Sequence, residues 1–584
     1  MSNMNKPLLT LLTLLIVGMG TLWASGTRDD YANSYFTIES LADNDTIKFL
    51  ILSGVTPEQM TSMSYSTDGT EWTTTMVDST DQRIIVVLNQ GEKVYFKGLG
   101  RQTNSDDPYA WCLVRGTAEH VVYGNIMSLL YGDDFASQTA LPEGTEFNFC
   151  GFFYNDRFLV SAENLVLTTT LTPACYYEMF MNCTKLVSAP ALPATTLTEN
   201  CYVFMFDNCS ALTEAPELPA TTLATFCYYG MFRHCLSLTE APALPAATLA
   251  YRCYGNMFED CSALVTAPAL PANTLSDRCY SYMFYNCSSL TTAPELPVTT
   301  LAYGCYSDMF KGCTSLATPP ELPATTLAPF CYQSMFNNCS SLTTAPSVLP
   351  ATTVPVHGYS YMFMDCLSLT EAPKLPATEL SERCYFAMFS GCNSLTEAPE
   401  LPATTLEKSC YAWMFESCFL LTKAPELPAP VLVDSCYQYM FFYCTSLDEV
   451  TGLATDISAT DCVENWTSFV GPSGTFYKAP EMEDWPLDSG SGIPLGWSVA
   501  NYDGLDEQQA QVAVYPNPVT DKLHITGADI QSVRLFDPQG RLVRTEESDR
   551  ADQLELDLQG YAKGVYTVSI LSKGRTLTRK VVVK

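Results

Sequence analysis

The sequence predicts a multidomain protein in which a repeat solenoid is flanked by an N-terminal and a C-terminal β-sandwich domain. A Met-Phe pair recurs eleven times between Cys175 and Leu447, at steps of 26 residues with a single step of 27. A fixed period in this range indicates a solenoid or a related array. The β-branched segments on either side of the array have no such period. The predicted parts are a signal peptide (1–25), a β-sandwich (26–124), the solenoid with degenerate end repeats (125–474), a closing segment and linker (475–504) and a C-terminal domain (505–584).

The first residues have the pattern of a secretory signal peptide. An apolar run from Leu8 to Val17 follows Lys6, and small residues suited to cleavage surround Ser25. This run is too short for a membrane-spanning helix, and no later run reaches the ~18 apolar residues that such a helix needs. We therefore expect an exported protein without a transmembrane segment.

The next part of the chain, residues 35–123, predicts several short strands. Segments 46–51 and 83–88 are rich in β-branched residues and lie between turn signals. Strands at this spacing favour a small antiparallel sandwich of immunoglobulin-like kind. The clearest hairpin runs from Tyr65 to Trp72, where the pair Asp68-Gly69 tolerates the positive φ angles of a tight turn.

Each copy of the repeat predicts one short helix and one short strand. In one copy the apolar residues fall at steps of four, four, four and three: Leu223, Cys227, Met231, Cys235 and Leu238. This spacing predicts a short helix, with Thr222 as its N-cap. Because Pro242 and Pro245 cannot continue a helix, residues 239–245 are expected to form a short strand and then an extended return. One strand and one helix per coil is the leucine-rich-repeat arrangement.

The array begins and ends in degenerate copies. A solenoid needs such caps, because an ordinary end coil would expose its core to water. At the N-terminal end Cys150 lies 25 residues before the first regular copy, and Phe158 stands where the second cysteine is expected. At the other end Cys462 begins a copy that continues into Trp466 and Phe469.

Most of the 24 cysteines come in pairs eight residues apart, such as Cys201 and Cys209. Export permits disulfides. Eight residues along a helix, however, span about 12 Å, which is beyond the reach of a disulfide. Gly358 also replaces the first cysteine of its copy, while Cys366 remains. Buried thiols are favoured, since free cysteine commonly packs as a small apolar side chain, and disulfides are the alternative.

Other columns of the repeat are constant or variable in a way that separates core from surface. A Tyr, a Met and a Phe recur in every clear copy, as at Tyr202, Met205 and Phe206, and we interpret them as a stacked core. An aromatic track for glycans or peptides is the alternative. Polar residues beside the expected strand vary instead, as on the binding surfaces of solenoids. The candidate binding face consists of Glu214, Glu217, Glu240, Glu295, Glu371, Lys374, Glu397, Glu400, Lys423 and Glu426. A merely solvated face is the other interpretation.

Charge and reactive residues exclude several classes of function. With 30 basic and 63 acidic residues the net charge is -33, which argues against binding to nucleic acid or to anionic lipid. The four histidines are scattered without HExxH spacing, and no CxxC pair suggests zinc. Because the carboxylates follow the repeat and form no unique constellation, we expect neither an enzyme nor a bound metal or cofactor.

The last residues carry four β-rich motifs in a fixed order: 514–519 (VYPNPV), 533–541 (VRLFDPQGR), 564–568 (GVYTV) and 579–584 (RKVVVK). Their order, spacing and terminal position resemble the sorting domain of the type IX secretion system. The resemblance implies export across the outer membrane of a Gram-negative bacterium by the type IX secretion machinery. It also implies removal of this domain and attachment to surface lipopolysaccharide, or release.

The repeat text MFxxCxSLTxAP resembles the BspA-like leucine-rich repeats of bacterial surface proteins, over the eleven clear copies. The Ala-Pro pair and the Pro-Ala-Thr-Thr return depart from the common leucine-rich pattern. The resemblance implies a secreted or cell-surface protein that binds a macromolecule, as an adhesin for a host or neighbouring-cell protein or glycan. A structural spacer or surface-layer component without a specific ligand is the alternative.

Overall fold

The computed structural model describes residues 31–51, 62–76, 83–98, 112–142, 145–483, 485–488, 490–502, 512–572 and 575–584. The predicted signal peptide lies outside these ranges. The chain divides into two compact units, the first ending at Val499 and the second comprising Lys478–Pro480 and Ala500–Lys584. Within the described residues no helix is long and apolar enough to cross a membrane.

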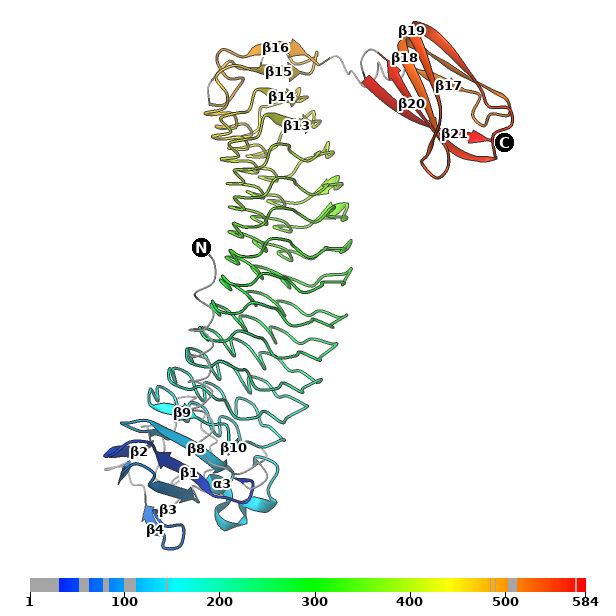
Figure 1. The fold of residues 1–584 in the computed structure, drawn as a ribbon. Helices are drawn as coiled ribbons and strands as arrows, with labels where there is room; N and C mark the ends of the chain where they lie inside the picture. Colours follow the sequence, from blue (N-terminus) through cyan, green and yellow to red (C-terminus); the bar gives the residue numbers. More distant parts are fainter. Residues whose placement is uncertain are drawn as a thin grey trace, which may run out of the picture. The chain divides into compact units, whose positions relative to one another are not determined.

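The first unit begins with mostly antiparallel strands in two sheets (Figure 1). One sheet has the order β10-β8-β1-β6-β3-β4, with β9 also paired to β8, and the other has the order β5-β2-β7. The Phe49 ring of β2 lies 5.5 Å from the Phe96 ring of β6, so the sheets contact each other through buried rings. The elements are β1 (Phe36–Ser40), β2 (Asp45–Ile51), β3 (Ser62–Ser66), β4 (Thr73–Met76), β5 (Arg83–Leu88), β6 (Lys93–Lys97), β7 (Cys112–Arg115), β8 (His120–Asn125), α3 (Ser128–Tyr131), η2 (Gly132–Ser137), β9 (Leu159–Ser161) and β10 (Leu165–Val166).

The predicted hairpin is present, because β3 and β4 pair in antiparallel orientation up to Tyr65 and Thr73. Its loop is longer than a two-residue turn, and of the Asp-Gly pair only Gly69 has a positive φ, at +74°. The Asp68 carboxylate instead accepts hydrogen bonds from the N–H groups of Thr70 and Glu71, both at 2.8 Å. A side-chain cap therefore shapes this loop.

The helix predicted in each coil is wrong, because the residues of the stripe form a run of tight turns. We call this run, residues 224–235 and its equivalents in the other coils, the turn edge. Alternate N–H groups bond within the coil, as in Tyr229 N to Phe226 O at 3.2 Å. The N–H groups between them bond to the next coil, as in Gly230 N to Gly255 O at 2.9 Å. Each coil is thereby joined to its neighbour through its backbone.

Positive φ angles recur at every fourth residue of the turn edge. A positive φ at the third residue of a turn is the mark of a type II turn. In one coil these residues are Phe226 (+55°), Gly230 (+60°) and His234 (+58°). A helix would use its backbone groups internally and, at about 10 Å across, would hold neighbouring coils apart. The turn run keeps the four-residue spacing of the buried side chains and leaves half of its N–H groups for the next coil.

The predicted strand is reduced in most coils to a single parallel bridge, as between Glu240 and Thr266. We call residues 239–245 and their equivalents the bridge edge. Its prolines lack the N–H donors that a continuous ladder requires. Longer parallel pairs join β11 (Thr353–Val354) to β12 (Glu379–Leu380), and β13 (Lys423–Leu427) to β14 (Glu449–Gly452).

The constant columns of the repeat form continuous stacks inside the solenoid. The Tyr rings from Tyr176 to Tyr437 stack at centroid distances of 5.6–6.2 Å. The Phe rings from Phe180 to Phe441 stack at 5.4–5.7 Å. All of these rings are buried, so the stacked core is confirmed and these columns cannot serve as an aromatic track.

The cysteine columns lie in the same core. The cysteines whose side chains are described are free and buried, which agrees with the thiol interpretation, although the helix on which its distance argument depended is absent. Burial raises the pKa of the Cys175 thiol to about 12. Because the thiolate is the reactive form, such thiols are unreactive in the folded protein.

Gly358 stands where the other copies have their first cysteine. A Cβ atom at this position would lie 2.9 Å from Val354 Cγ1 and 3.1 Å from the carbonyl oxygen of Pro355. In this coil Val354 and Pro355 therefore leave little room for a side chain at position 358.

The Tyr column predicts an unusual response to loss of a hydroxyl. The Tyr254 hydroxyl is buried and has no hydrogen-bond partner among the described residues. Because burying an unpaired hydroxyl is unfavourable, we expect Tyr254→Phe to keep or raise the free energy of unfolding in urea, by up to about 1 kcal/mol. Tyr176→Phe is the control and should destabilise, since the Tyr176 hydroxyl accepts a hydrogen bond from Thr168 N at 3.3 Å. Equal losses in the two variants would contradict this expectation.

The N-terminal cap differs in register from the prediction. Phe149 and Phe153 stack on the Tyr and Phe columns, at 6.0 and 5.0 Å. Cys150 therefore lies outside the cysteine columns. Asp156, not Phe158, takes the place of the second cysteine. The Asp156 N–H bonds to Phe153 O, just as the Cys183 N–H of the next coil bonds to Phe180 O.

The C-terminal cap is closed by tryptophans. Trp466 stacks on Trp485 at 5.4 Å and donates its indole N–H to Gly492 O at 2.9 Å. Two further strands, β15 (Thr475–Lys478) and β16 (Ser498–Asn501), extend the sheet that begins with β13 and β14. The degenerate copy and the closing segment thus cover the last regular coil.

The second unit is a five-stranded antiparallel sheet of order β17-β18-β20-β21, with β19 paired to β18. The Asn517 side chain joins the first predicted motif to the last, because it bonds to Lys580 O and to Val582 N, both at 2.9 Å. The strands are β17 (Ala513–Tyr515), β18 (Lys522–Phe536), β19 (Leu542–Asp557), β20 (Gly564–Ser572) and β21 (Arg575–Val583).

Candidate functional site

The residues predicted for the binding face form two rows along the bridge edge. The first row contains the position at which most of the bridges between coils are made, and the second row lies three residues later in each coil. In one coil the second-row residue Lys374 makes the bridge instead, to Val348. All ten predicted side chains are exposed. The first row contains Glu214, Glu240, Glu371, Glu397 and Lys423, and the second row contains Glu217, Glu295, Lys374, Glu400 and Glu426.

The local sequence explains why these side chains point outward. In one coil the buried leucines Leu212 and Leu218 lie on either side of Glu214 and Glu217 and fix the segment to the core. The Ala-Pro pair between the two rows is short and has no side-chain polar group. The charged side chains therefore rise from a low apolar surface that leaves room for a ligand.

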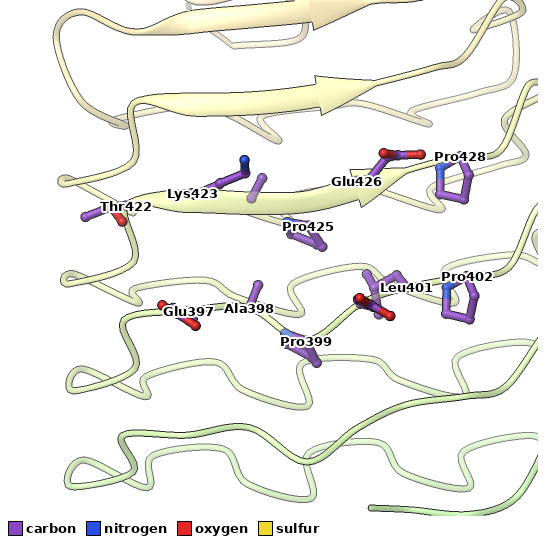
Figure 2. Close-up of a pocket in the computed structure, with 12 residues that line it drawn as sticks. Glu397, Ala398, Pro399, Leu401, Pro402, Thr422, Lys423, Pro425, Glu426 and Pro428 are labelled. Atoms are coloured by element: carbon purple, nitrogen blue, oxygen red, sulfur yellow. The ribbon is translucent and has the colours of Figure 1, made fainter. Parts of the chain in front are cut away.

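A groove of 710 Å³ lies on the bridge edge between two neighbouring coils (Figure 2). Four of the predicted residues line it, with an apolar floor of alanines and prolines between them. Its charged residues are Glu397 and Glu400 from one coil and Lys423 and Glu426 from the next. The first-row partners Glu397 and Lys423 also form the backbone bridge between these coils.

The rows differ in charge along the array. The first row is neutral in its middle part, where it contains threonines such as Thr266 and Thr292, and it is charged towards both ends. The Lys423 ammonium lies 2.5 Å from Glu449 Oε1 of the following coil. The groove region therefore presents mixed charge, with more carboxylates than ammonium groups.

The structure brings some of the predicted residues together and leaves others apart. Glu371 and Lys374 lie on the coil next to the groove. Glu214, Glu217 and Glu240 share two neighbouring coils near the N-terminal end, and Glu295 of the second row lies in the middle of the array, beside the neutral Thr292 of the first row. A ligand of moderate size could contact the groove residues at once, but not all ten.

The site offers carboxylate acceptors, an ammonium group and an apolar floor, which suit non-covalent recognition. Within the described part of the chain, no three His, Cys, Asp or Glu side chains are arranged to hold a metal ion.

The sequence-based search missed the polar clusters of the turn edge. His234 lies between two carboxylates, with Nδ1 3.0 Å from Asp207 Oδ1 and Nε2 3.3 Å from Asp260 Oδ2. The Arg233 guanidinium is also 2.7 Å from the almost fully buried carboxylate of Asp207. Asp207 and Arg233 occupy the same column of successive coils, and so do His234 and Asp260, so alignment by the 26-residue period could have found them.

Two family models match the chain. The model for the BspA type leucine rich repeat region matches in several copies, over residues 160–291, 253–386 and 357–459. The model for the secretion system C-terminal sorting domain matches residues 513–584. No curated protein and no solved structure matches the chain.

Proposed function

This chain belongs to the BspA-type leucine-rich-repeat family, and from that premise we propose that it binds a macromolecule through the two charged rows of its bridge edge. The observation that carries the proposal is the groove lined by Glu397, Glu400, Lys423 and Glu426. A repeated scaffold with variable exposed residues beside constant buried ones is the arrangement that solenoids use for recognition.

The protein is secreted or displayed on the cell surface, since it combines these repeats with a type IX sorting domain. We infer that its partner is a protein or glycan of a host or a neighbouring cell, which makes it an adhesin. We also infer that the sorting domain is removed after export and that the remainder is attached through lipopolysaccharide or released. We also propose the domain boundaries predicted from the sequence, with a β-sandwich domain at each end of the solenoid.

The second candidate is a structural spacer. The uninterrupted Tyr and Phe stacks favour it, because they give the array a regular core that requires no ligand. Neither candidate involves chemistry on a substrate, and we assign the protein no enzymatic role.

Charge reversal in the groove tests the binding proposal. We expect the double variant Glu397→Lys and Glu400→Lys to lose binding to the purified partner, or attachment to cells that carry it, by about tenfold or more, equivalent to ~1.4 kcal/mol. Surface plasmon resonance and a cell-attachment assay measure the effect. The same reversal at Glu214 and Glu217 locates the contact along the array.

The spacer proposal makes the opposite prediction. Deleting one whole 26-residue copy from the neutral middle should weaken attachment if length matters, while the charge reversals should then have no effect. If the reversed variants attach normally and the shortened array does not, binding through the bridge edge is wrong.

A further inference from the structure

The turn edge of the last coils carries five aromatic rings in mutual contact. Trp413 stacks on Tyr439 at 4.2 Å, and Tyr443 stacks on Phe469 at 4.5 Å. Phe442 contacts all four rings, at 4.6–6.3 Å. Phe469 is 60% exposed and Tyr443 is 41% exposed. We call these five residues the aromatic platform.

Several rings elsewhere on the turn edge have a cation of the same chain over them. The Arg233 guanidinium lies 4.7 Å from the Phe204 ring centroid and also pairs with the Asp207 carboxylate. Arg252 lies 5.7 Å from the Phe226 ring. Further pairs of the same kind are Arg278 with Tyr303, Lys311 with Tyr285 and Arg383 with Phe386. The turn edge therefore repeatedly places a guanidinium or ammonium group over an aromatic face.

The aromatic platform has the rings and the carboxylates of this pattern but no cation. Residues 424–477 contain seven acidic residues and no Lys, Arg or His. None of the cation–ring contacts among the described residues involves the platform. The carboxylate of Glu416, three residues after Trp413, accepts hydrogen bonds from the hydroxyls of Ser390 and Ser417, at 2.5 and 2.7 Å.

The surroundings of the aromatic platform are acidic. Burial and, after it, the charge of Glu416 raise the pKa of Asp365, which lies two coils before Glu416. An aromatic face attracts cations through its quadrupole, and this attraction grows where carboxylates stand nearby. Anionic partners are repelled, and a second copy would bring the same acidic surface against itself.

We propose that the aromatic platform binds a lysine- or arginine-rich segment of another protein. The partner's cationic side chains would take the place over these rings that Arg233, Arg252 and Arg278 occupy over the earlier ones. The platform lies on the turn edge and the groove on the bridge edge, so this site is independent of the one proposed above and either can fail alone.

The test is fluorescence anisotropy of a labelled, end-capped octa-arginine peptide titrated with the full-length protein. We expect Trp413→Ala and Phe469→Ala each to weaken binding about tenfold, which reflects the loss of cation–ring contacts. Both variants keep the net charge of the protein, so they separate the platform from general electrostatic attraction. Trp413→Phe, unlike Trp413→Ala, should bind the peptide nearly as the parent does, because it keeps an aromatic face.

Two variants serve as matched controls. Tyr251, which is 38% exposed, already has Arg252 over its ring, so Tyr251→Ala should bind the peptide as the parent does. Glu163→Gln removes a charge from an exposed side chain of the degenerate first coil, outside both proposed sites, and should have only the small effect of any single distant charge. Thermal unfolding establishes that each variant is folded.

Three results would overturn the proposal. The first is unchanged peptide binding in folded Trp413→Ala and Phe469→Ala. The second is binding of a neutral oligosaccharide, cellohexaose, that is lost in the same variants while peptide binding is kept. The third is self-association in sedimentation that depends on Phe469, which would make a second copy the occupant.

Discussion

Replacing Asp156 with alanine is expected to destabilise the N-terminal end of the solenoid by about 3–5 kcal/mol, because it leaves a buried imidazole without its nearest anion. His120 of β8 is fully buried, and its Nε2 lies 3.1 Å from Asp156 Oδ2. Asp45 Oδ2 is 3.8 Å from the other ring nitrogen. Asp156 comes from the degenerate first coil, so this cluster joins the N-terminal sheets to the solenoid.

The surrounding backbone is built for these carboxylates. Asp156 Oδ1 accepts hydrogen bonds from Phe158 N and Leu159 N at 3.1 and 3.2 Å. Asp45 Oδ1 accepts them from Thr117 N and Ala118 N at 2.7 and 2.9 Å. Hydrogen bonds of this kind stabilise both carboxylates as acceptors. Their negative charge is best compensated when the His120 imidazole between them is protonated.

The same cluster predicts how stability depends on pH. Burial alone would lower the pKa of His120, but the charges of Asp156 and Asp45 and the hydrogen bonds raise it above 6.5. A group whose pKa is higher in the folded than in the unfolded state stabilises the fold fully below the unfolded value, here 6.5. This contribution is lost as the pH rises through the folded value. Urea unfolding between about pH 5.5 and 8.5 should show the loss in the parent and not in Asp156→Ala.

A matched control is available at the same junction. Glu119, next to β8 of the N-terminal sheets, pairs with Lys185 of the solenoid at 2.8 Å, but both side chains are about half exposed. Glu119→Ala should therefore change the free energy of unfolding by less than about 1 kcal/mol. An Asp156→Ala variant as stable as Glu119→Ala would show that the buried cluster contributes no more than a surface pair.

The sequence predicted the period, the buried columns and the caps of the solenoid, but not the conformation of its turn edge. Steps of four between apolar residues fit a helix and fit a chain of turns with a four-residue repeat equally well. The distinguishing signal lies in the third positive-φ column, which is mostly asparagine, aspartate or glycine: Asn182, Asn208, Asp260, Asn286, Gly312, Asn338, Asp365 and Gly391. These residues tolerate a left-handed backbone and are poor choices for a helix interior.

The candidate site divides in the same way. Exposure of Glu397, Glu400, Lys423 and Glu426 follows from their alternation with buried leucines, which the sequence displays directly. Their shared groove depends on how two coils stack, which no single copy reveals. The sequence-based prediction missed the change of register at Asp156, because it aligned the cap on Cys150 and so assumed that the cap continues the cysteine columns. The ring stacks show that the cap keeps the aromatic columns instead.

Replacing Phe284 with alanine is expected to cost about 3–5 kcal/mol, as for other fully buried aromatic side chains. The Phe284 ring is inaccessible to solvent and stacks on Phe258 at 5.7 Å and on Phe310 at 5.6 Å. The cavity therefore affects the contacts of one coil with both of its neighbours. Tyr285→Ala is the matched control, since this adjacent ring is half-buried on the turn edge and contacts Lys311 at 5.9 Å. Its loss should cost about 1 kcal/mol.

Because Phe284 lies in the middle of the array, Phe284→Ala should also change the shape of the urea unfolding transition. Each coil of a solenoid contacts only its neighbours, so stability is the sum of coil terms and interface terms. A cavity in the middle weakens two adjacent interfaces and should let the two halves unfold separately, with a broader urea transition and a smaller slope m. Tyr285→Ala leaves both stacks complete and should keep one transition. A single sharp transition in Phe284→Ala, merely shifted to lower urea, would mean that coupling through the backbone bonds of the turn edge outweighs the aromatic stack.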